Sequence, residues 1–279
     1  MELVTRHGAL DVSGLPAVMG ILNVTPDSFS DGGQFLALEA ASVRAIEIVA
    51  EGADIIDVGP ESSRPGAQPV DPAEQIRRAV PVIDAVRRKH ADVALSIDTT
   101  SSAVAAAALG AGADIVNDTS ALRGDPEMCR LVADTGVPVV LMHMQGTPTT
   151  MQEDPSYADV VGDVKDFLSE RVDCALSSGI DPSQLIIDPG IGFGKTTAHN
   201  CELIRRLDEF VALGLPVLVG ASRKSVVRSA LGTDPSMVLA GSLMCALAAA
   251  AAGAKIVRVH DVRDTVELLG AARAAIPTS

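Results

Sequence analysis

Residues 54–97 contain three successive patterns: DIIDV at Asp54–Val58, DPAEQIRRAVPVIDAV at Asp71–Val86, and VALSI at Val93–Ile97. The first and third are short, almost continuous apolar runs, which are typical of strands buried on both faces of a parallel sheet. The middle segment opens with an Asp-Pro helix-start signal, and its apolar residues then recur at helical spacing. The three segments therefore predict one strand–helix–strand unit.

The same alternation extends in both directions along the chain. The predicted strands are Val18–Val24, Asp54–Val58, Val93–Ile97, Asp114–Asn117, Val137–Met142, Leu185–Asp188, Pro216–Gly220 and Ile256–Val259. Eight strands alternating with helices in 279 residues favour an α/β fold of the (β/α)8 TIM-barrel type, for which about 250 residues is typical. The rival doubly wound sheet would carry a G-x-G-x-x-G turn, which the sequence lacks. We expect a single domain over residues 1–279, with residues 1–16 as an extension or short strands before the first barrel strand.

Composition narrows the classes of partner. Hydrophobic residues make up 47 % of the chain, which excludes a disordered protein. The net charge is −14, from 22 Lys and Arg against 36 Asp and Glu, and an acidic body is repelled by nucleic acid and by anionic membranes. Aromatic residues are only 2 %, with no Trp, so base-stacking surfaces are not expected. We therefore expect small-molecule partners rather than a nucleic acid or a membrane.

Cysteine usage and the chain ends favour a cytoplasmic protein. The four cysteines form no CxxC pair, so neither a zinc site nor a disulfide framework is expected. The first residues lack the basic start and apolar core of a signal peptide. Residues 237–254 carry no charge, but they are mostly Ala, with Gly241 and Ser242. We interpret this segment as a helix buried against protein, at a subunit interface, rather than as a membrane span.

Polar residues stand at the ends of the predicted strands, where barrel enzymes carry their chemistry. Asp98, Asn117 and Asp188 end strands three, four and six. Their carboxylate and amide groups suit the edge of a nitrogen-rich heterocycle, whose N–H groups need acceptors. Each Asp alone is more often a helix cap or an ion-pair partner, so the hypothesis rests on the set.

A second group of strand-end residues is cationic in an acidic chain: Arg64, Lys224, Arg258 and His260. A local basic cluster indicates an anionic ligand, and Arg is well suited to phosphate oxygens. Arg258 and His260 belong to a strand that must be buried, where such groups need partners. For His143, a role as a hydrogen-bonded polar residue of the core is as good an explanation as a functional role.

Two loops add to this pattern. Residues 190–196 resemble a phosphate loop, but Pro189 stands where its first Gly is needed, so a ligand-covering loop is favoured over a nucleotide cradle. Residues 23–33 suit a mobile lid, since they hold Phe29 in a polar, glycine-containing segment.

Motifs along almost the whole chain resemble the dihydropteroate synthase family. They are GILNVTPDSFSDGG at 20–33, SSRPGA at 62–67, SIDT at 96–99, LMHMQG at 141–146, DPG at 188–190, SRKS at 222–225 and RVHDV at 258–262. The resemblance implies a (β/α)8 barrel that joins 6-hydroxymethyl-7,8-dihydropterin diphosphate to p-aminobenzoate and releases diphosphate, with Mg²⁺ as cofactor. It also implies a homodimer and a sulfonamide target.

The resemblance also assigns roles. It implies that Asp98, Lys224 and Arg258 are catalytic and that Asn23 contacts Mg²⁺. The pterin and diphosphate residues would be Ser63, Arg64, Asp98, Asn117, Asp188, Lys224, Arg258 and His260. The residues around p-aminobenzoate would be Phe29, Ser63, Pro65, Phe193 and Ser225.

The sequence departs from the family pattern at Gly59-Pro60-Glu61, where the family usually has Gly-Gly-Glu. Pro fixes φ, so this loop could be stiffer and the response to sulfonamides altered. Two other functions stay open as alternatives: a methyltetrahydrofolate-binding methyltransferase barrel and a non-catalytic pterin-binding homologue. The cations have less reason to exist in the first, and the second would lose Asn23, Arg64 or Arg258, all of which are present.

Overall fold

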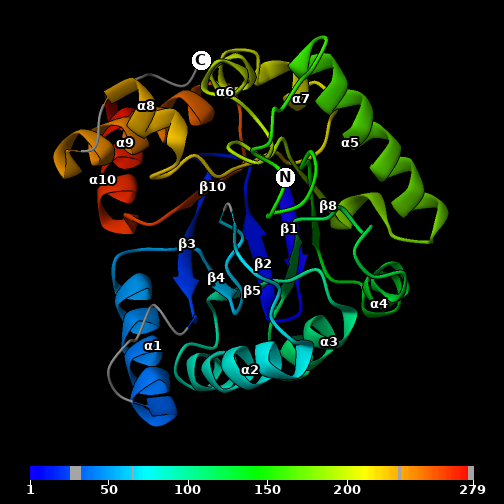
Figure 1. Cartoon of the computed structure of the whole chain (residues 1–279). Coiled ribbons are helices and arrows are strands. Elements are labelled where there is room, and N and C mark those ends of the chain that lie inside the picture. The colour runs from blue at the N-terminus through cyan, green and yellow to red at the C-terminus, as the bar shows by residue number, and fades with distance from the viewer. Residues whose placement is uncertain (26–32, 65, 232–233, 276–279) are drawn as a thin grey trace.

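The computed structural model describes residues 1–25, 33–64, 66–231 and 234–275 (Figure 1). Its central strands are β3 (Ala17–Asn23), β4 (Ile55–Gly59), β5 (Ala94–Asp98), β6 (Ile115–Asp118), β7 (Val139–Met142), β8 (Leu185–Asp188), β9 (Leu218–Val219) and β10 (Ile256–Val259). They form one parallel sheet in the order β8-β7-β6-β5-β4-β3-β10-β9. The two edge strands meet where the amide of Ile187 donates to the carbonyl of Pro216 at 3.0 Å. The predicted (β/α)8 barrel is confirmed.

Helices surround this barrel (Figure 1). They are α1 (Gly33–Ala50), α2 (Pro72–Lys89), α3 (Ser102–Gly110), α4 (Glu127–Thr135), α5 (Val160–Ser177), α6 (Thr197–Arg205), α7 (Asp208–Val211), α8 (Ser225–Leu231), α9 (Pro235–Ala251) and α10 (Val262–Ala275), with a 3₁₀ turn, η2 (Pro182–Gln184). The Asp-Pro signals act as expected: Asp71 accepts a hydrogen bond from the amide of Ala73 at 2.9 Å, and Asp234 does the same for Ser236. The main core lies between the sheet and these helices.

The first residues form a two-stranded antiparallel hairpin, β1 (Glu2–Thr5) and β2 (Gly8–Asp11). Leu3 and Val12 are buried in a cluster with residues that open the barrel strands, among them Met19 and Ile115. The hairpin therefore closes the amino-terminal end of the barrel. This leaves the carboxyl end of the strands for the site.

Helix α9 corresponds to the uncharged segment near the carboxyl terminus. One of its sides is buried through Ala246 and Ala249, whereas Met237 and Met244 are exposed, the latter to 60 %. Among the helices of the described residues, none is long and apolar enough to cross a membrane.

Candidate functional site

At the carboxyl end of the barrel, Arg258 of β10 bridges two carboxylates. Its Nε donates to Oδ2 of Asp57 at 2.6 Å, and its Nη2 donates to Oδ2 of Asp98 at 2.9 Å. Asn117 of β6 donates from Nδ2 to the same Asp57 oxygen at 3.1 Å. Four strands thus bring Asp57, Asp98, Asn117 and Arg258 into one hydrogen-bonded group.

The electrostatics of this group are set by burial. Burial raises the pKa of Asp98 to about 7; Arg258 opposes that rise, and the Asp57 charge adds to it. Asp57 is fully buried, and its second oxygen, Oδ1, receives no hydrogen bond from the described residues. The site therefore holds two carboxylates close together with one guanidinium between them.

Asp188 and Lys224 form a neighbouring pair of opposite charges. Burial raises the pKa of Asp188, and Lys224 opposes the rise. Burial lowers the pKa of Lys224 to about 7, and Asp188 opposes that fall. The Nζ of Lys224 donates to the carbonyl of Ile191 at 2.6 Å and lies 4.2 Å from the ring centroid of Phe193. At Gly192, with φ +86°, an added Cβ would lie 2.9 Å from Cδ of Lys224, so glycine makes room for this side chain.

The loop at residues 189–195 is fixed to the protein rather than free. Its carbonyls accept from side chains in turn: Gly190 and Phe193 from Lys195, Ile191 from Lys224, Gly192 from Gln152 and Gly194 from Tyr157. Lys195 is the lysine of the phosphate-loop-like motif. Its ammonium group binds these carbonyls, and the residue is only 1 % exposed. This burial agrees with the rejection of a nucleotide cradle. The Phe193 ring is itself buried, with Met142, Met144 and Met151.

His260 lies beside the first cluster, close to three arginines. Its Nδ1 lies 3.1 Å from Oγ of Ser222, and its backbone amide donates to the same oxygen at 3.2 Å. Burial lowers the pKa of His260 to about 4, and the charges of Arg223, Arg258 and Arg64 lower it further. Three arginines therefore act on one imidazole at this end of the barrel. Such an arrangement suits an anionic ligand.

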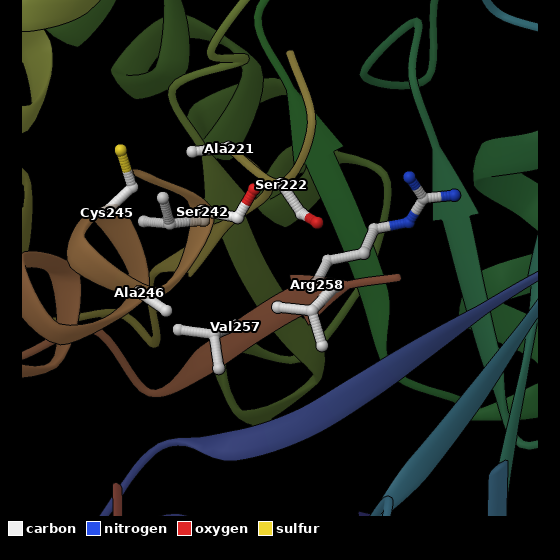
Figure 2. A pocket seen from close by; sticks show the side chains of 9 residues that line it. Ala221, Ser222, Ser242, Cys245, Ala246, Val257 and Arg258 are labelled. Atoms are coloured by element: carbon white, nitrogen blue, oxygen red, sulfur yellow. The ribbon is translucent and has the colours of Figure 1, made fainter. Parts of the chain in front are cut away.

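Ser222 also lines a small cavity behind the strands, between β9, β10 and α9 (Figure 2). Ser242, Cys245 and Ala246 of α9 form its far side. Ser242 accepts from the amide of Arg223 at 3.0 Å, and Arg223 in turn pairs with Asp261. In Figure 2 the guanidinium of Arg258 points away from this cavity. Through Ser242, helix α9 therefore helps to hold the turn that carries Lys224.

The loop after β4 carries Ser63 and Arg64, which are half-buried and exposed respectively. Glu61 anchors this loop, because its carboxylate accepts from the amide of Val70 at 2.6 Å and from Gln75 at 3.2 Å. The amide of Gly66 donates to the carbonyl of Pro148, in the loop after β7, at 3.0 Å. Exposed Ser225 begins α8, next to Lys224. Phe29 and Pro65, two of the residues predicted for p-aminobenzoate, lie outside the described residues.

The predicted metal residue, Asn23, ends β3. Its Oδ1 would lie 3.4 Å from a Cβ built on Gly59, and Cβ of Asp98 would lie 3.9 Å from the same point, so Asn23 faces the charged cluster. Within the part of the chain that the structure describes, no group of three or more His, Cys, Asp or Glu could hold a metal alone. Mg²⁺ is usually held by one or two protein oxygens together with water and substrate phosphates. One amide oxygen close to the charged cluster fits that pattern.

Two important residues were not among the predicted site residues. Asp57 stands out in the sequence as a charged residue inside the apolar run DIIDV. Nothing in that run indicates that its partner is Arg258, which lies 201 positions away. Lys195 was visible only as the end of a glycine loop. A lysine at the end of a glycine-rich loop that follows a strand is the signal by which sequence could have identified it.

The fold and the site together define a (β/α)8 barrel with a charged small-molecule site at the carboxyl end of its strands. A family model described as "Pterin binding enzyme" matches residues 19–260. The dihydropteroate synthase of Escherichia coli K12 is 46 % identical over 276 residues, covering 99 % of this chain and 97 % of that protein. The chain belongs to the dihydropteroate synthases, a family of pterin-binding transferases.

Solved structures agree with this placement. The Xanthomonas albilineans dihydropteroate synthase with 4-aminobenzoic acid superposes with a TM-score of 0.90 at 46 % identity, covering 96 % of each chain. The Yersinia pestis enzyme in a sulfonamide drug complex gives a TM-score of 0.90 at 45 % identity, covering 99 % of this chain and 100 % of that one.

Proposed function

We propose that this protein condenses 6-hydroxymethyl-7,8-dihydropterin diphosphate with p-aminobenzoate to give 7,8-dihydropteroate and diphosphate. The observation that carries the proposal is the division of the site into two chemical groups. Buried acceptors from Asp98, Asn117 and Asp188 stand beside the cationic side chains of Arg258 and Lys224. One ligand that combines a nitrogen-rich ring with a diphosphate needs both groups.

The pterin and diphosphate would divide these residues between them. Asp98, Asn117 and Asp188 would accept hydrogen bonds from the ring, and Lys224 would contribute a donor. Arg64, Arg258 and His260 would bind the diphosphate, with Ser63 beside them on the loop after β4. The p-aminobenzoate would lie against Phe193, Ser63 and Ser225, with Phe29 and Pro65 completing this part of the site.

The reaction needs no protein nucleophile. The bond between the pterin CH₂ and the diphosphate oxygen breaks, and the electron pair leaves with diphosphate. Arg258 stabilises the charge that develops on the leaving group. The pterin ring spreads the positive charge that develops on its CH₂ carbon, and the Asp98 carboxylate stabilises it. The amine nitrogen of p-aminobenzoate then bonds to this carbon and loses a proton.

Asn23 would supply a protein oxygen to Mg²⁺ bound with the diphosphate. When bound, the metal neutralises charge on the leaving group. The remaining positive charge would come from Arg64 and Arg258, which the chain supplies itself. His260, whose pKa is lowered to about 4, would bind the diphosphate as a neutral hydrogen-bond donor.

The two alternative functions are not favoured. The relatives and solved structures compared above are dihydropteroate synthases. A methyl-transferring barrel would have no leaving diphosphate for the cations to stabilise. A non-catalytic homologue would not need Arg258 held between two buried carboxylates.

The test is diphosphate release from the dihydropterin diphosphate, measured with and without p-aminobenzoate and Mg²⁺. Release that requires all three components, with 7,8-dihydropteroate formed in equal amount, is the expected result. Tight binding of the pterin without release would refute the proposed reaction while leaving a pterin-binding protein.

We also infer the setting in which this enzyme works. The hairpin core is continuous with the barrel strands, which supports a single domain over residues 1–279. The exposed Met237 and Met244 of α9 support a homodimer, and the four free cysteines support a cytoplasmic location. Sedimentation at micromolar concentration tests the dimer, and a monomer there would refute it. The Yersinia pestis complex supports a sulfonamide as an inhibitor of this chain.

A further inference from the structure

Lys195 is a buried lysine that the proposed reaction does not use. Its Nζ donates to the carbonyls of Gly190 and Phe193 and to Nδ1 of His143, each at 2.9 Å. Burial lowers the pKa of His143 to about 3, and the Lys195 charge lowers it further, so the imidazole is neutral and can accept this bond. Burial lowers the pKa of Lys195 to about 7, and Asp188 opposes that fall. Three hydrogen bonds offset the cost of burying the charged form.

The two loop carbonyls that Lys195 binds belong to Gly190, just before Ile191, and to Phe193 itself. The carbonyl of Ile191, between the two anchored carbonyls, accepts from Lys224 at 2.6 Å. The centroid of the Phe193 ring lies 4.2 Å from Nζ of Lys224. Lys195 therefore fixes the backbone that orients the Phe193 ring.

The loop packs closely against its neighbours around the anchor. A Cβ on Gly190, with φ +69°, would lie 1.9 Å from the carbonyl oxygen of His143. Tyr157 donates to the carbonyl of Gly194 at 2.7 Å from outside the loop. The Lys195 bonds differ from this tie, because one of them ends on the carbonyl of Phe193 itself.

We propose that Lys195, with neutral His143 as its acceptor, is a positioning residue that sets the Phe193 ring for the arylamine substrate. The inference rests on the proposed function, in which Phe193 contacts p-aminobenzoate. It assigns Lys195 no contact with either substrate. Lys224 keeps Asp188 as a partner when the loop loosens, so the pterin half of the site should change less.

The experiment compares Lys195→Met with the wild-type enzyme. Met has similar length but donates no hydrogen bond. We expect the KM for p-aminobenzoate to rise about tenfold, with the Kd for the dihydropterin diphosphate changed by less than about threefold. Lys165→Met is the matched control. Lys165 pairs with Glu209 at 2.9 Å, and neither residue belongs to the loop at 189–195. This control should leave both constants unchanged.

A merely structural role gives a different result. It would lower the fraction of active enzyme, measured as pterin-binding stoichiometry by calorimetry, and leave the arylamine KM of the active fraction unchanged; that result would overturn the proposal. An equal weakening of both substrates would overturn it as well. A wild-type enzyme without turnover would instead refute the proposed function, and this inference with it.

Tyr157→Phe provides the second variant if Lys195→Met does not fold. It removes one tie to the same loop and leaves the buried ammonium in place. We expect a smaller rise in the arylamine KM, about twofold to threefold, with unchanged pterin binding. An unchanged arylamine KM in folded Tyr157→Phe would count against the proposal.

Discussion

Asp57 shares one oxygen, Oδ2, between Arg258 and Asn117 and is fully buried. Removing one member of a buried ion pair leaves the other charge uncompensated. Asp98 alone would then hold the guanidinium, and from a different direction. Asp57 therefore controls the position of Arg258 without being one of the predicted ligand-binding residues.

We expect Asp57→Ala to lower the free energy of unfolding by about 3 kcal/mol and kcat/KM by roughly tenfold or more. Asp57→Asn should cost less stability, because its amide oxygen can stay where Oδ2 lies. Urea unfolding and steady-state kinetics measure both effects. If the alanine and asparagine variants were equally stable, the hydrogen bond that asparagine can keep would contribute nothing, and the lost charge of Asp57 alone would explain the destabilisation.

Asp98 and Lys224 predict the pH dependence of the free enzyme. The pKa of Asp98 is raised to about 7, so its carboxylate is lost as the pH falls below that value. The pKa of Lys224 is lowered to about 7, so its positive charge is lost as the pH rises above it. Because kcat/KM reports the free enzyme, its profile for the pterin substrate should be bell-shaped with a maximum near neutral pH.

Binding of diphosphate-free hydroxymethyl-dihydropterin, followed by calorimetry across pH, removes the titration of the substrate phosphates from this measurement. Asp98→Asn should abolish the acid limb and keep the alkaline one. A wild-type profile that stays flat from about pH 5 to about pH 9 would contradict the assignment of these limbs.

At the scale of single residues, sequence could identify most of the charged and polar side chains that the structure brings together, but not their pairings. Asp98, Asn117, Asp188, Lys224 and Arg258 are recognisable because each lies at, near or just after the carboxyl end of a strand, where a barrel gathers its side chains. That Arg258 donates to Asp57, or that Lys195 folds back onto His143, depends on distances between segments far apart along the chain. Local patterns hold no information on those distances.

At the scale of elements, the strands were predictable because buried parallel strands are short, continuous apolar runs. Leu185–Asp188 and Ile256–Val259 agree with β8 and β10 at both ends. The predicted strand Pro216–Gly220 is reduced to Leu218–Val219, since Pro216 has no amide to donate and Val217 pairs with Ile187 only as an isolated bridge. The ends of such a strand are decided by which backbone groups form hydrogen bonds, rather than by hydrophobicity.

The loop from β4 to α2 provides a prediction at this scale. The carbonyl of Pro60 accepts from Arg78 of α2 at 3.0 Å, and Glu61 anchors Val70. We expect Pro60→Gly to lower the free energy of unfolding by about 0.4–1 kcal/mol, because the unfolded chain gains freedom. We also expect about threefold weaker sulfonamide inhibition, because the segment before Ser63 and Arg64 becomes less restricted.

Asp71→Ala is the control for that loop, since it removes the cap of α2 and leaves residues 60–64 in place. It should lower stability by about 1 kcal/mol without changing the inhibition constant. Chemical denaturation and inhibition of turnover measure the two variants side by side. An inhibition constant unchanged by Pro60→Gly would rule out the idea that this proline tunes the response to sulfonamides.

At the scale of the whole molecule, stability and chemistry are assigned to opposite ends of one barrel. The apolar cluster around Leu3 fills the amino-terminal end, and the charged residues gather at the carboxyl end. The sequence indicated only an extension or short strands over residues 1–16. It could not show that the hairpin closes the barrel, because the partners of Leu3 come from strands spread over the whole chain.

This separation predicts the behaviour of Leu3→Ala. The Leu3 side chain is 1 % exposed, so its truncation leaves a cavity and should lower the free energy of unfolding by about 2–5 kcal/mol. The KM for both substrates and kcat should stay at the wild-type values at a temperature where the variant is folded, because the proposed substrate site lies at the other end of the strands. Val4, on the same strand but 68 % exposed, gives the control: Val4→Ala should change neither stability nor turnover. A change in substrate KM in folded Leu3→Ala would show that the two ends of the barrel are coupled.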